Sequence, residues 1–181
     1  MAILKIARMG HPVLLAQAMP VADVAACELV RLVGDMVETL ADAGGVGLAA
    51  PQVFRGVRLF IYHVPGSRAD DGADMAMRVV FNPVVTPLGD EMVMGWEGCL
   101  SIPGLRAAVP RFARVRLAAQ DETGAGFEVE ASGFEARVIQ HEADHLDGVM
   151  YPMRMRDFRY FGFNEEISRS GLEIPEDADA D

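Results

Sequence analysis

Hydrophobic residues at helical spacing define the first element of the chain. Between residues 23 and 43, leucine, valine and methionine recur every three or four positions, and charged residues fall on the opposite face. Asp23 can cap the start of this helix, and Gly44 and Gly45 can end it. We therefore predict an amphipathic helix over residues 23–43, with Cys27 as a small packing residue within it.

Short apolar runs separated by glycine and polar residues predict strands in the middle of the chain. A strand is expected over residues 57–62, after a glycine-bearing loop over residues 44–52. The polar residues 66–74 are typical of an exposed loop. Two valine-containing runs flank Asn82-Pro83, which indicates a strand that is interrupted there or lies at the edge of a sheet.

A hairpin and a second helix follow. A strand over residues 114–118 is expected to pair with residues 127–131 through a turn at residues 121–124. Ser132 and Glu135 then have the spacing of a capping box at the start of a helix, which Gly148 closes. A helix, several strands and a second helix, in that order, predict an α+β fold with mostly antiparallel pairing.

Length and composition set the domain organisation. The chain has 181 residues, of which 51% are hydrophobic, enough for one domain with a sizeable core. We predict a single catalytic domain over residues 1–168 and an acidic, disordered tail over residues 169–181, because the last nine residues carry five acids and little to bury.

Charge and hydropathy limit the partners and the compartment. The net charge of −11 argues against direct binding of nucleic acid, which needs clustered lysine and arginine. No apolar run is long enough to cross a bilayer, and the N-terminus does not have the pattern of a secretory signal. We therefore expect a cytoplasmic protein with no membrane partner, in which two cysteines cannot form a disulfide framework.

The most specific local pattern is the five-residue sequence from His141 to His145, which reads His-Glu-Ala-Asp-His. On a helix, residues four apart lie on one face, so both imidazoles can bind one metal ion. Glu142 is turned by about 100° from His141, since a turn holds about 3.6 residues, and so lies beside the metal as a proton carrier. Asp144 is expected either to orient one of the histidines or to be an exposed acid.

A catalytic metal site needs a third protein ligand. One group of metalloproteases extends the motif to a third histidine, but Tyr151 stands at that position, which excludes the group. A downstream glutamate, Glu165 or Glu166, could complete the site, as could Cys99, because a thiolate is a strong ligand for borderline metals. Spacing alone does not choose between them.

Three segments in order point to one family. They are Gly45-Val46-Gly47-Leu48-Ala49-Ala50-Pro51-Gln52, Glu97-Gly98-Cys99-Leu100-Ser101 and Gln140-His141-Glu142-Ala143-Asp144-His145. Together they closely resemble the signature segments of peptide deformylase. The resemblance extends from the Gly10-His11-Pro12 segment to about Phe163.

The resemblance implies a fold, an activity and a set of site residues. The implied fold has antiparallel β-sheets packed around the central helix that carries the histidines. The implied activity removes the formyl group from the initiator methionine of N-formylmethionyl nascent peptides, with transient contact with the ribosome. The implied ligands are Cys99, His141 and His145, with Fe²⁺ as the metal in the cell and Ni²⁺, Co²⁺ or Zn²⁺ also accepted.

The same resemblance makes Glu142 the general base and then the general acid. It assigns the oxyanion donors to the side chain of Gln52 and the backbone N–H of Leu100. Seven residues are placed in the substrate site: Val46, Gly47, Glu97, Arg106, Phe134, Arg137 and Val138.

Arg137 departs from the apolar residue of the best-known members. Its position four residues before His141 puts it near the metal-binding face of the helix. Since a charge inside an apolar pocket is costly, either its guanidinium reaches the rim and binds substrate carbonyls, or it turns to solvent or pairs with an acid.

Overall fold

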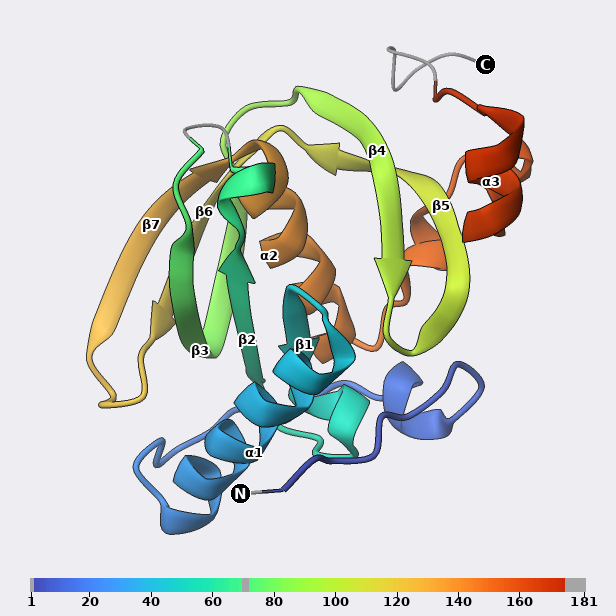
Figure 1. The fold of residues 1–181 in the computed structure, drawn as a ribbon. Coiled ribbons are helices and arrows are strands. Elements are labelled where there is room, and N and C mark those ends of the chain that lie inside the picture. The colour runs from blue at the N-terminus through green and yellow to red at the C-terminus, as the bar shows by residue number, and fades with distance from the viewer. Residues whose placement is uncertain (1, 70–71, 175–181) are drawn as a thin grey trace.

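Helix α2 (Gly133–Leu146) lies between two antiparallel sheets, as Figure 1 shows for this computed structural model, which describes residues 2–69 and 72–174. The predicted α+β fold, with sheets around the helix that carries both histidines, is confirmed. Within the described residues, no helix is both long and apolar enough to span a bilayer.

The larger sheet has five strands in the order β1-β2-β3-β6-β7, and every neighbouring pair is antiparallel. Its strands are β1 (Gly47–Ala49), β2 (Leu59–Val64), β3 (Met75–Pro87), β6 (Arg114–Gln120) and β7 (Gly126–Ser132). The predicted hairpin is therefore confirmed, and Asp121 holds its turn by accepting hydrogen bonds from the backbone of Thr123 and Ala125.

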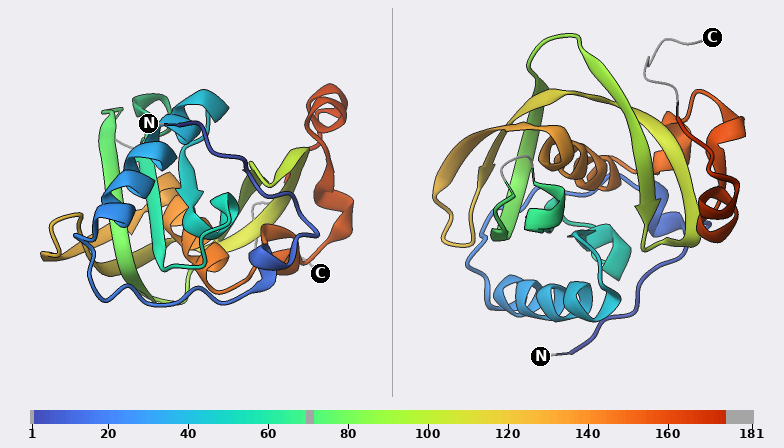
Figure 2. Two further views of the ribbon diagram at one scale, coloured as in Figure 1. Left: turned by 90° about the horizontal axis from the view of Figure 1, so that it is seen from below. Right: turned by 45° about the horizontal axis from the view of Figure 1, so that its top comes forward.

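Strand β2 separates the two long helices. Because side chains alternate along a strand, Phe60 and Tyr62 pack on the α2 side, whereas Leu59 and Ile61 pack on the side of helix α1 (Cys27–Ala43). Both sets are fully buried. Figure 2 shows α1 on one side of this sheet and α2 on the other.

Helix α1 begins four residues later than predicted. Asp23 accepts a hydrogen bond from the N–H of Ala25 in the turn before the helix, and Ala26 is the N-cap residue. The C-terminal prediction is confirmed, since Gly44 ends the helix with φ of 64°. Cys27 is exposed on the first turn, so the prediction that it packs in the core is wrong.

The Asn82-Pro83 segment interrupts β3 inside the sheet, because β3 pairs with β2 on one side and β6 on the other. The register shifts between Phe81 and Val84, and Asn82 has φ of 49°. Its side chain donates to the carbonyl of Val21 and accepts from the same residue's N–H. The predicted interruption is confirmed, but the position at a sheet edge is wrong.

The start of α2 is also as predicted, although the predicted capping box does not form. Ser132 is the N-cap residue but makes no capping hydrogen bond with its side chain. Glu135 accepts a hydrogen bond of 3.0 Å from the hydroxyl of Tyr62 instead, which ties the first turn of α2 to β2. Gly148 follows the end of the helix with φ of 72°, as expected for a C-terminal stop.

The strands of the smaller sheet were not predicted individually. The sheet consists of β4 (Met92–Cys99), β5 (Ile102–Phe112) and β8 (Phe161–Phe163), in that order and antiparallel. Leu100 and Ser101 form the tight turn between β4 and β5, so that Cys99 is the last residue of its strand. This sheet brings Cys99 to the histidine face of α2.

Helix α3 (Asn164–Ser170) follows β8 and extends two residues into the segment predicted as the tail. Residues 175–181 of that predicted tail lie outside the described residues. The described part of the chain also contains five short 3₁₀ turns: η1 (Pro12–Leu15), η2 (Ala50–Val53), η3 (Gly66–Arg68), η4 (Tyr151–Arg154) and η5 (Phe158–Tyr160).

Candidate metal centre and active site

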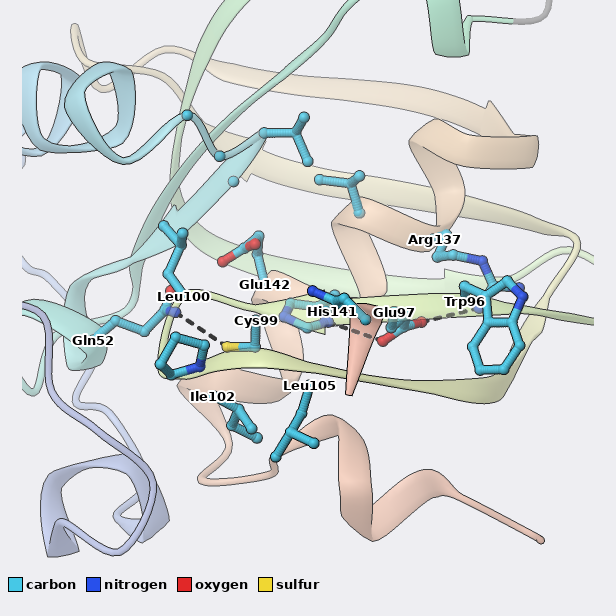
Figure 3. A pocket seen from close by; sticks show the side chains of 18 of the residues that line it. Gln52, Trp96, Glu97, Cys99, Leu100, Ile102, Leu105, Arg137, His141 and Glu142 are labelled. Carbon is cyan, nitrogen blue, oxygen red and sulfur yellow. Dashed lines mark hydrogen bonds and ion pairs between the residues drawn. The ribbon is translucent and has the colours of Figure 1, made fainter. Parts of the chain in front are cut away.

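Three predicted ligands meet between α2 and the end of β4. The sulfur of Cys99 and the ring nitrogens of His141 and His145 lie within 4.8 Å of one another, and Cys99 Sγ is 3.3 Å from His145 Nε2. Figure 3 shows Cys99 and His141 in the same pocket, with the sulfur of Cys99 turned toward Gln52. Tetrahedral ligand atoms at about 2.0–2.3 Å from one ion are about 3.3–3.6 Å apart, so the separation of Cys99 and His145 suits ligands of a single metal ion.

The competing ligands do not join this group. Glu165 and Glu166 lie on α3, and Glu166 pairs with Arg169 at 2.7 Å. Among the described residues, the only such cluster is that of Cys99 and the two histidines. The chemistry of one thiolate and two imidazoles suits iron, nickel, cobalt or zinc, and three protein ligands are typical of a catalytic site with an open position.

Glu97 holds His141 in place. Its Oε2 is 2.8 Å from His141 Nδ1, which leaves Nε2 of that ring for a metal. Burial alone would raise the pKa of Glu97. The hydrogen bonds from Arg111 and His141 together outweigh that effect and hold the pKa well below its usual value. This buried, ionised carboxylate thus binds a ligand histidine and two arginines, and its expected contact with substrate stays a prediction.

Arg111 connects Glu97 to a second buried acid. Its guanidinium donates to both oxygens of Glu97, at 2.8 and 3.0 Å, and to Asp144 Oδ2 at 2.6 Å. Asp144 also accepts from Arg154, at 2.8 and 3.1 Å. Asp144 is thus neither an exposed acid nor a direct partner of a histidine. It supports His141 through Arg111 and Glu97, a role that its position in the motif does not reveal.

Arg137 is committed to the same network. Its guanidinium donates to Glu97 at 3.0 Å and to the carbonyls of Val93, Gly95 and Val109 at 2.6, 3.3 and 2.7 Å. Its side chain is only 11% exposed. Of the two predicted alternatives, the structure shows pairing with an acid, because donors that bind β4, β5 and Glu97 do not extend to the rim.

Glu142 faces the metal ligands from within the protein. Its side chain is buried, and among the described residues its Oε2 has no hydrogen-bond partner. Burial raises the pKa of Glu142 to about 7, which suits a group that takes up and releases a proton near neutral pH. Gly47 lies against this carboxylate, since a Cβ atom there would collide with Oε1 and lie 2.7 Å from Cδ.

Gln52 directs its amide group to the same place. The N–H of Ala49 donates to its Oε1 at 2.8 Å, which fixes the orientation of the side chain. Nε2 then points toward Cys99 Sγ at 3.4 Å and Ser101 Oγ at 3.3 Å, as Figure 3 shows for the first of these. The side-chain amide of Gln52 is thus held next to the ligand Cys99.

One pocket of about 560 Å³ is lined by Gln52, Cys99, His141 and Glu142. Leu100 lines it, together with most of the predicted substrate residues: Val46, Gly47, Glu97, Phe134, Arg137 and Val138. Sequence reasoning missed further lining residues, which come from three different elements: Arg68, Trp96, Ile102 and Leu105.

Arg106 lies outside this lining. Its guanidinium is 5.0 Å from the centre of the Trp96 ring, and its Nη2 donates to Ser168 at 3.1 Å. The structure therefore places Arg106 behind a wall residue of the pocket, next to α3.

The chain matches known proteins over most of its length. A family model described as polypeptide deformylase matches residues 3–160. The chain is 48% identical over 163 residues to peptide deformylase 1 of Bordetella pertussis, covering 90% of this chain and 93% of that protein. It is 45% identical over 175 residues to peptide deformylase 2 of Pseudomonas putida, covering 95% of this chain and 98% of that protein.

Solved structures agree with these matches. The peptide deformylase of Thermus thermophilus has a TM-score of 0.75 and 45% identity, covering 84% of this chain and 86% of that one. A class I type b peptide deformylase of Acinetobacter baumannii, bound to Met-Ala-Ser, has a TM-score of 0.79 and 35% identity, covering 84% of this chain and 98% of that one. The chain therefore belongs to the polypeptide deformylase family, a family of metal-dependent hydrolases.

Proposed function

We propose that this enzyme removes the N-formyl group from the initiator methionine of newly made polypeptides and releases formate. The observation that carries the proposal is the buried carboxyl of Glu142, which faces the same pocket as the ligand cluster and has no hydrogen-bond partner for its Oε2 among the described residues. A carboxyl in this state is available to carry a proton between water and a leaving amine.

The protein's own groups divide the chemistry among them. A divalent ion, when bound by Cys99, His141 and His145, supplies Lewis-acid chemistry and acidifies water. Glu142 takes a proton from the attacking water and delivers it to the amine as the carbon–nitrogen bond breaks. The side chain of Gln52 and the backbone N–H of Leu100 donate to the developing oxyanion.

Strand β1 supports a role for the peptide backbone in binding. It pairs with β2 on one side and forms the edge of the five-stranded sheet, where an extended peptide can add as a further strand. Val46, Phe134 and Val138 give the pocket an apolar wall for the methionine side chain. The related Acinetobacter baumannii enzyme has been solved with Met-Ala-Ser bound, a peptide that begins with methionine.

Cellular context completes the proposal. We infer that Fe²⁺ is the metal in the cell, with Ni²⁺, Co²⁺ and Zn²⁺ as substitutes, because a thiolate and two imidazoles accept all four. We place the enzyme in the cytoplasm, where it meets nascent chains through transient contact with the ribosome, and we expect no direct binding of nucleic acid or membrane.

The proposal is tested with the nickel-loaded enzyme and two peptides, formyl-Met-Ala-Ser and acetyl-Met-Ala-Ser. Formate should be released from the first, whereas the second should be cleaved far more slowly. The reason is steric: the acetyl methyl group must fit between Gln52 and the backbone of β1, beside the carboxylate that already excludes a Cβ atom at Gly47. Comparable cleavage of both peptides would contradict the proposal.

A further inference from the structure

A second hollow of about 420 Å³ lies beside the active-site pocket. Among the described residues, Arg68 and Phe134 are the two that line both spaces. The second hollow is otherwise lined by residues with no place in the active site, among them Val64, Asp74 and Met75. Arg68 and Phe134 therefore form the boundary between the pocket and the second hollow.

The pair is a stacked cation and ring. The guanidinium carbon of Arg68 is 3.8 Å from the centre of the Phe134 ring, well within cation–π distance. Phe134 is fixed on the first turn of α2, and Arg68 ends the short turn η3, which lies beside the start of α2 in Figures 1 and 2. Two hydrogen bonds hold η3: the N–H of Arg68 donates to the carbonyl of Pro65 at 2.8 Å, and the N–H of Gly66 donates to the side chain of Asp74 at 2.6 Å.

Arg68 differs from the other arginines near the active site. Arg111 and Arg137 are each held by several hydrogen bonds to acids or carbonyls. Over residues 2–69 and 72–174, the guanidinium of Arg68 has no hydrogen bond or ion pair, and it lies against the ring of Phe134 instead. Partial burial lowers the pKa of Arg68, as expected for a cation that gives up water.

We propose that Arg68, stacked on Phe134, forms the end wall of the pocket for the first side chain of the substrate and thereby determines which formylated residue the enzyme accepts. This inference rests on the proposed function. With the wall in place, the pocket accommodates a side chain of the length of methionine. Without it, the pocket continues into the second hollow and accommodates a longer or wider side chain.

The substitution Arg68→Ala tests the wall directly. The variant is assayed on formyl-Met-Ala-Ser and on formyl-Phe-Ala-Ser, and the readout is the ratio of the two kcat/KM values. On formyl-Phe-Ala-Ser, its kcat/KM relative to the methionine peptide should rise by about tenfold or more, the scale on which an apolar pocket discriminates by size. The gain should appear as a lower KM.

Arg159→Ala is the matched control. Arg159 also lies over an aromatic ring, with its guanidinium carbon 6.0 Å from the centre of Tyr160, and it lines neither hollow. This variant should keep the wild-type ratio of phenylalanine to methionine substrates. An unchanged ratio in Arg68→Ala would overturn the proposal, as would an equal rise in both variants.

A binding measurement separates this inference from the proposed function. Calorimetry of the metal-loaded enzyme with the unformylated peptides Met-Ala-Ser and Phe-Ala-Ser reports the shape of the pocket without any turnover. If the wild type released no formate, the proposed function would fail, yet a shift toward Phe-Ala-Ser in Arg68→Ala would still support the wall. If formate were released but Arg68→Ala bound both peptides as the wild type does, only the wall would be refuted.

Discussion

Replacing Glu97 by glutamine removes one charge from the buried network behind the metal site. Glu97 accepts two hydrogen bonds from Arg111 and one from Arg137, and bonds His141 Nδ1. Its side chain is only 4% exposed, and that of Arg111 is only 5% exposed. In Glu97→Gln, an amide NH₂ replaces one oxygen and faces groups that are themselves donors.

The expected magnitudes follow from this burial. Breaking a buried ion pair by removing one partner costs about 3–5 kcal/mol, because the remaining charge loses its compensation. For a chain of this size, that corresponds to a fall in Tm of about 6–20 °C. The change should also weaken metal binding by about 10- to 100-fold, since the one remaining oxygen cannot serve both Arg111 and His141 and the histidine ring is held less firmly.

The assay combines thermal unfolding of the metal-free protein with competition for metal against a chelator. Glu130→Gln is the matched control, because Glu130 also accepts from two arginines, Arg114 and Arg116, but its side chain is 52% exposed. Exposed pairs contribute only about 0–1 kcal/mol, so this control should change Tm and metal affinity little. Equal effects of the two substitutions would refute the role assigned to Glu97.

Three further substitutions test individual parts of the site. Glu142→Gln should retain its metal yet lose nearly all turnover, and metal analysis beside a formate assay would show an error in the proton relay if kcat stayed near normal. Gly47→Ala should lower kcat sharply because its Cβ atom would displace the carboxylate of Glu142, whereas Gly34→Ala, which meets open space, should leave kcat unchanged. Cys99→Ala should lose most of the bound metal while Cys27→Ala, on the exposed face of α1, keeps it, and full occupancy in the first variant would remove Cys99 from the ligand set.

The parts of the site that are local in sequence were predictable. His141, Glu142 and His145 lie within one helical turn or so of each other, and helix geometry alone fixes which of them share a face. The hairpin of β6 and β7 was likewise predictable, because its alternating residues and its turn are contiguous.

The rest depends on contacts between distant segments. Strand β5 contains Pro103 and Pro110, residues that argue against a strand, yet it forms the centre of the smaller sheet. Arg111 follows directly in this strand, and nothing in its neighbours indicates that it reaches Asp144 on α2. The same holds for Arg68 and Phe134, which are 66 positions apart in the numbering and meet only because η3 lies against α2.

The most direct test of the metal-hydrolase account measures metal content and formate release in the same anaerobically purified sample, before and after chelation. If the enzyme is a metal-dependent deformylase, the sample should contain a single ion per chain and release formate from formyl-Met-Ala-Ser. Removal of the ion should abolish that activity, and addition of Ni²⁺ should restore it. Full activity in the metal-free protein, or no formate release from the fully loaded one, would contradict that account.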